Sequence, residues 1–100
     1  MAERIFTVES VKQDLVDITQ QYVGDTPEET TEARMVLGVV FSIPEIQELM
    51  VNLVLAVFEH PETALLQAES FKLGMLAQCP SMAKPATAIL MELLSDFCGV

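Results

Sequence analysis

The most constraining feature of this sequence is an apolar stretch from Met35 to Phe58, MVLGVVFSIPEIQELMVNLVLAVF, which holds two charged residues in 24 positions. Three interpretations are open: a membrane span, the buried centre of a folded domain, or an apolar surface for a partner. Pro44 divides the stretch, and proline is tolerated in the first turn of a helix but breaks its interior. Each uncharged piece has about ten residues, whereas a transmembrane helix needs about 20. The stretch therefore predicts two helices joined by a turn, and no membrane span.

A Pro-Glu dipeptide recurs every 17 residues, beginning at Pro27, Pro44 and Pro61. Proline at the first helical position and glutamate in the first turn both favour the start of a helix. Four residues are predicted to cap helix starts: Thr7, Thr26, Ser42 and Ser81. The second and third are followed three positions later by glutamate, which is the spacing of a capping box.

Apolar periodicity completes the prediction of an all-α fold, because the chain has no alternating strand pattern and no hairpin-turn dipeptide. We expect one domain over residues 1–100, with a loose N-terminal segment at 1–7. The compact bundle has five expected helices, at about 8–23, 27–41, 43–59, 61–78 and 82–97. The helix at 43–59 is apolar almost all round, so we expect the bundle to pack around it.

Residue spacings of three and four predict the buried face of each helix. The first helix is expected to bury Val8, Val11, Leu15, Ile18 and Tyr22. The fourth is expected to bury Leu65, Ala68, Phe71, Met75 and Leu76. The last is expected to bury Ile89, Leu90, Leu93, Leu94 and Phe97. The same pattern puts Asp14 on a solvent face, and Gly38 and Gly74 permit close contact between helices without requiring it.

The charge balance narrows the classes of partner. The net charge is −10, from 15 acidic and five basic residues, and the bases form no cluster. Phosphate backbones and anionic lipids need clusters of Lys and Arg, so a nucleic-acid partner is not expected. An acidic face solvates a small protein and can also steer a basic partner towards it.

The chain offers little chemistry. Its one histidine, His60, precedes Pro61 and is interpreted as a turn residue and not as a metal ligand, and Cys79 and Cys98 lack the paired spacing of a zinc site. We predict no enzymatic activity, catalytic residue, metal or cofactor. Two cysteines form no disulfide framework, and the first residues lack the pattern of a signal peptide, so we expect a cytoplasmic protein.

The apolar excess carries the functional prediction. Hydrophobic residues make up 51% of the chain and the mean hydropathy is +0.40, which is high for a small domain and favours an apolar surface covered by another chain. We predict a non-enzymatic acidic interaction module, an adaptor, regulator or chaperone-like protein that self-associates as a homodimer and has a basic or apolar protein partner.

The alternative function is a carrier or sensor of a small hydrophobic ligand, in a Met-lined pocket between the third, fourth and fifth helices. The candidate interface or pocket residues are Met50, Val54, Phe58, Phe71, Met75, Met91 and Leu94. An open apolar surface would favour the interaction module, and an enclosed cavity would favour the carrier.

Overall fold

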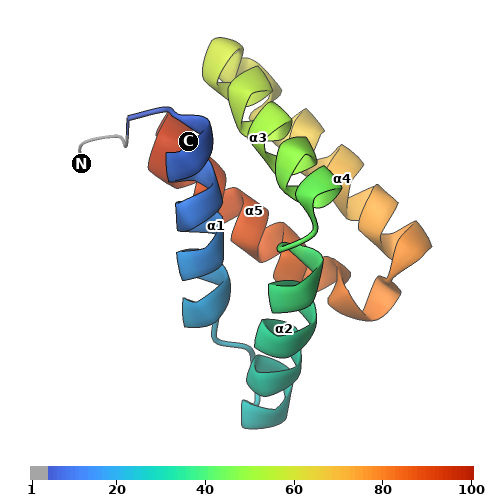
Figure 1. Cartoon of the computed structure of the whole chain (residues 1–100). Coiled ribbons are helices and arrows are strands. Elements are labelled where there is room, and N and C mark those ends of the chain that lie inside the picture. Colours follow the sequence, from blue (N-terminus) through green and yellow to red (C-terminus); the bar gives the residue numbers. More distant parts are fainter. Residues whose placement is uncertain (1–4) are drawn as a thin grey trace.

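The computed structural model describes residues 5–100, and every regular element in them is helical (Figure 1). In chain order the elements are α1 (Val8–Gln21), α2 (Pro27–Val40), α3 (Pro44–Glu59), the 3-10 turn η1 (Pro61–Thr63), α4 (Ala64–Gln78), the 3-10 turn η2 (Pro80–Met82) and α5 (Ala83–Cys98). The predicted all-α bundle of five helices is confirmed. The fourth predicted helix begins as the 3-10 turn η1 before it continues as α4.

The first two helix starts are capped by the predicted residues. The Thr7 hydroxyl accepts a hydrogen bond from the Ser10 amide, and the Ser10 hydroxyl accepts one from the Thr7 amide, both at 3.0 Å, which closes a capping box. The Thr26 hydroxyl accepts from the Glu29 amide at 3.1 Å. The Glu29 carboxylate accepts from the Asp25 amide instead of the Thr26 amide, so the second predicted box is only half formed.

The other two predicted caps are wrong. The Ser42 hydroxyl donates to the Val39 carbonyl at 2.7 Å, and Ile43 precedes α3 without a capping side chain. Ser81 lies inside η2, and Met82 precedes α5, again without a side-chain cap. In both places the serine that the sequence pattern assigned to the start of the next helix belongs to the turn before that helix.

The central position in the bundle belongs to α5 and not to the helix predicted at 43–59. α5 contributes eight buried residues and α3 contributes four. α5 packs against α1, α3 and α4, and it runs between them in Figure 1. A helix buries only the sides that its neighbours cover, and on α3 this leaves Leu49, Leu55 and Phe58 exposed. The apolar composition of α3 therefore extends beyond the part of the helix that its neighbours cover.

α2 and α3 meet at a sharp bend, as the position of Pro44 predicts. Their axes differ by 96°. Within residues 5–100, no single helix is long and apolar enough to cross a membrane. α2 and α3 reach the length and apolar composition of a membrane span only when they are taken together, as this bent pair.

α1 is buried on more of its circumference than one stripe. Asp14, predicted on a solvent face, is only 1% exposed, whereas Val8, predicted to be buried, is exposed. Asp14 is buried because α1 contacts α2, α3 and α5, so neighbours cover several of its sides. Just before α1, Phe6 packs on the rings of Phe58 and Phe97, with centroids 5.6 Å and 6.2 Å away. This aromatic contact joins the chain ahead of α1 to α3 and α5.

Candidate functional site

The site begins with α4, which packs mainly on α5 and has little buried surface. Within α4 only Ala64 and Ala68 are buried. All four leucines of the helix are exposed: Leu65, Leu66, Leu73 and Leu76. The predicted burial of Leu65 and Leu76 is therefore wrong, with exposed fractions of 74% and 45%. Apolar residues are spread around the whole helix, while neighbouring helices cover only part of it.

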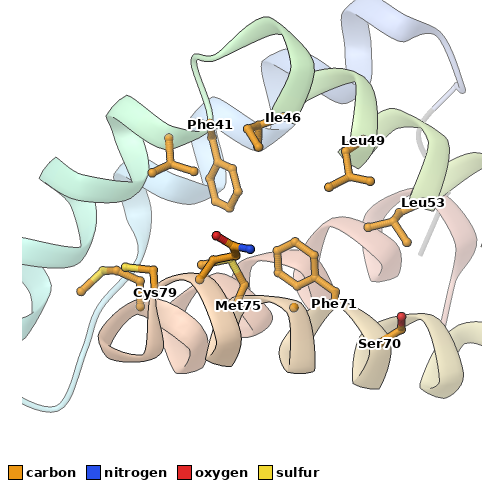
Figure 2. Close-up of a pocket in the computed structure, with 12 residues that line it drawn as sticks. Phe41, Ile46, Leu49, Leu53, Ser70, Phe71, Met75 and Cys79 are labelled. Atoms are coloured by element: carbon orange, nitrogen blue, oxygen red, sulfur yellow. The ribbon is translucent and has the colours of Figure 1, made fainter.

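An apolar groove lies between α3 and α4, with a volume of about 550 Å³. Three segments supply its walls: the end of α2, the first half of α3, and the second half of α4 with the turn that follows it. The lining residues are Val40, Phe41, Ile46, Leu49, Leu53, Ser70, Phe71, Gly74, Met75, Gln78, Cys79 and Met82. Figure 2 shows the rings of Phe41 and Phe71 directed into the gap from opposite sides.

The groove is open to solvent and is not an enclosed cavity. Leu49 on the α3 wall is 47% exposed, and Ser70, Gly74 and Gln78 on the α4 wall are exposed as well. Gly38 and Gly74 were expected to permit close contact between helices, but a Cβ atom added at either would meet nothing within 4 Å. At Gly74 the missing side chain therefore leaves space in the groove wall.

The lining can hold apolar groups but offers little for acid–base chemistry. Its polar side chains are those of Ser70, Gln78 and Cys79, and none of the lining residues is charged. The Cys79 sulfur lies 3.9 Å from the Ser81 hydroxyl oxygen. A general acid or base needs a titratable group placed at the reacting atoms, and among the described residues that line the groove only Cys79 has a titratable side chain.

The structure brings together two of the seven predicted site residues, Phe71 and Met75, which both line the groove. The other five lie elsewhere. Three of them are fully buried in the core: Met50, Val54 and Leu94. Met91 is partly buried against the core, and Phe58 is exposed beside Phe6.

Sequence reasoning missed the α3 wall of the groove. Ile46, Leu49 and Leu53 line it at spacings of three and four residues. That spacing was a usable signal, because it places the three side chains on one side of a helix. The prediction treated 43–59 as a central helix that is apolar almost all round, so it did not single out this side as a binding surface.

Two of the groups weighed for chemistry lie outside the groove. His60 ends α3 in a turn, as predicted, and its Nδ1 lies 3.5 Å from an oxygen of Glu62, with both side chains exposed. The Cys98 thiol donates to the Val54 carbonyl at 3.6 Å. In the part of the chain that the structure describes, no group of three or more His, Cys, Asp or Glu side chains is placed to hold a metal ion.

One exposed ion pair ties the loop before α2 to the start of α5. The Lys84 ammonium donates to the Asp25 carboxylate at 2.8 Å. This hydrogen bond, with the attraction between the two charges, lowers the pKa of Asp25 and raises the pKa of Lys84. Nearby, the Arg34 Nε donates to the Tyr22 carbonyl at 2.8 Å, which holds α2 against the end of α1.

Comparison of the chain with protein-family models, with curated proteins and with solved structures finds no significant match. The functional argument therefore depends on the geometry of the groove and on the surface of α4.

Proposed function

We propose that this protein is a non-enzymatic, acidic interaction module of the cytoplasm, which self-associates through apolar helix surfaces and binds a partner helix in the α3–α4 groove. The observation that carries the proposal is the groove itself, because it is apolar, open and uncharged. Large exposed apolar surfaces on small domains mark interaction sites. Two cysteines without a disulfide support a reducing compartment.

The dimensions of the groove fit a short length of helix. Its walls run from Ile46 to Leu53 along α3 and from Ser70 to Gln78 along α4. At 1.5 Å per residue these lengths are about 10 to 12 Å, or roughly two helical turns. An amphipathic helix that lies in such a groove is anchored by apolar residues at positions i, i+3 or i+4, and i+7.

The charge beside the groove indicates a basic partner. α3 carries Glu45, Glu48 and Glu59 and no Lys or Arg. Glu45 lies one turn before Leu49, so its carboxylate borders the α3 wall. A partner helix with Lys or Arg along the edge of its apolar face would place those cations beside this wall. Attraction of this kind speeds association and excludes acidic competitors more than it adds affinity.

One observation favours the alternative, a carrier of a small hydrophobic ligand. The volume of about 550 Å³ lies inside the usual range of ligand pockets, about 300–1,000 Å³. Such pockets cover most of their ligand, however, and the exposed α3 and α4 walls leave one side of this groove uncovered. The open form supports a protein partner over an enclosed ligand.

A titration with two peptides and one dye tests the proposal. We expect a synthetic amphipathic Leu/Lys helix to bind, as measured by fluorescence anisotropy, and the matching Leu/Glu helix to bind on the order of tenfold more weakly, with a gap that narrows as salt is added. Leu49→Ala should weaken binding of the Leu/Lys peptide by about tenfold, because it removes most of one apolar contact. Met35→Ala is the matched control, since Met35 is also exposed but lies outside the groove.

Three results would contradict the proposal. Equal effects of Leu49→Ala and Met35→Ala would place the peptide elsewhere. Binding of the neutral dye N-phenyl-1-naphthylamine without binding of either peptide would support the carrier. Binding of neither peptide and no dye would remove the groove as a binding site.

A further inference from the structure

The outward side of α4 carries a stripe of four residues with a symmetric order, Leu65, Glu69, Lys72 and Leu76, which we call the α4 stripe. The spacings are four, three and four, so at 3.6 residues per turn all four side chains lie within an arc of about 60°. All four are exposed, and none of them lines the groove. The stripe therefore occupies a different side of α4 from the groove wall.

We propose that the α4 stripe packs antiparallel against the same stripe of a second copy, around a two-fold axis that passes between Ser70 and Phe71. Leu65 and Leu76 are equally distant from that point, and so are Glu69 and Lys72. An antiparallel copy reverses the order. It therefore sets Leu65 against Leu76 of the second copy and Glu69 against Lys72 of the second copy. A two-fold interface requires this self-complementarity.

The neutral charge of the α4 stripe supports a second copy as the occupant. Each chain carries a net charge of −10, so two copies repel one another over most approaches. The α4 stripe is neutral, and its Lys72 is the only Lys or Arg between Pro44 and Gln78. Among the described residues, no ion pair joins Glu69 to Lys72 within the chain, so both charges are available to a second copy.

Charge also selects the register. The two remaining exposed leucines of α4, Leu66 and Leu73, could pair with each other around an axis one residue earlier. That register would bring the Glu69 carboxylates of the two copies together near the axis, and like charges in contact are destabilising. The register of the α4 stripe replaces this repulsion with two pairs of opposite charge.

This inference rests on the self-association proposed above and specifies its surface. It leaves the α3–α4 groove unoccupied, because the groove wall and the α4 stripe are on different sides of the helix. A contact between two helices is small, so we expect a weak dimer whose population depends on concentration.

Sedimentation velocity of the full chain over a range of concentrations, with charge-swap variants, tests the inference. Glu69→Lys and Lys72→Glu should each weaken the dimer by on the order of tenfold, because each creates two contacts between like charges. The double variant E69K/K72E should restore wild-type dimerisation. An equal mixture of the two single variants should also dimerise, because every contact across that interface joins a lysine to a glutamate.

Glu28→Lys is the matched control, since it makes the same change in net charge as Glu69→Lys at an exposed position of α2. It should leave the dimer within about twofold of wild type. Far-UV circular dichroism shows whether each variant remains helical.

The outcomes separate this inference from the proposal on which it rests. A wild-type chain that stays monomeric at every concentration would overturn self-association, and the α4 pairing with it. A wild-type dimer that neither single swap weakens would overturn only the α4 pairing. Weakening by both single swaps without rescue in the double variant or the mixture would exclude the pairing of Glu69 with Lys72.

Discussion

The most direct test of the packing compares two separate leucine-to-alanine variants, one at the centre of the bundle and one on α4. Leu90 on α5 is completely buried, and Leu65 on α4 is 74% exposed. Truncation of a buried leucine loses its transfer free energy and leaves a cavity, so Leu90→Ala should lower the free energy of unfolding by about 3–5 kcal/mol. Fully burying a leucine contributes about 2 kcal/mol, and Leu65 has only about a quarter of that burial to lose, roughly 0.5 kcal/mol.

These values are large and small, respectively, against a typical total stability of about 5–15 kcal/mol. In urea unfolding followed by circular dichroism, at a concentration low enough to keep the chain monomeric, Leu90→Ala should shift the midpoint strongly and Leu65→Ala only slightly. The corresponding change in Tm for Leu90→Ala is roughly 10–30 °C. Equal losses for the two variants would show that the outer side of α4 is covered in the folded monomer, and would refute both the peripheral placement of α4 and the surface role of its leucines.

Two further predictions concern the caps and the exposed ion pair. Thr7→Ala should cost about 1 kcal/mol in urea unfolding, because it removes the cap of α1, whereas Ser81→Ala, which removes no cap, should cost much less; equal losses would contradict the observed caps. The pKa of Asp25 is lowered in the folded state, so its pairing with Lys84 should favour folding above the ordinary Asp pKa of about 3.9 and lose that effect as the pH falls through the folded value. Wild type should therefore exceed Asp25→Asn only slightly in its free energy of unfolding, because the pair is exposed, and urea unfolding at several pH values should show this difference shrinking on acidification. A difference that grows at low pH would contradict the lowered pKa of Asp25.

Local signals in the sequence were sufficient for the helices and insufficient for their arrangement. Pro27, Pro44 and Thr7 act within a turn of their own positions, so the starts of α1 to α3 could be predicted to within a residue. The environment of Leu65 depends on which helices lie across α4, and nothing within a few residues of Leu65 carries that information. The same holds for Asp14, whose burial follows from the three neighbours of α1.

The candidate site shows the same division. Met75 was identified because methionine suits adaptable binding surfaces, and this property belongs to the residue itself. Phe71 was identified with it because both follow the apolar spacing of the fourth predicted helix. The α3 wall was not identified, because its leucines have the same spacing whether they face a core or a groove. Only the relative positions of α3, α4 and α5 decide between the two.

The central position of α5 also bears on how the chain folds as it is synthesised. The ribosome releases α1 to α4 before α5, while the helix that supplies eight buried residues is the last of the five to be made. Until α5 emerges, the apolar sides that α1, α3 and α4 later bury against it remain uncovered, and exposed apolar surface of this kind is prone to aggregation. Closure of the core therefore waits for α5, and a nascent chain that lacks α5 exposes the apolar surface that α5 covers in the folded domain.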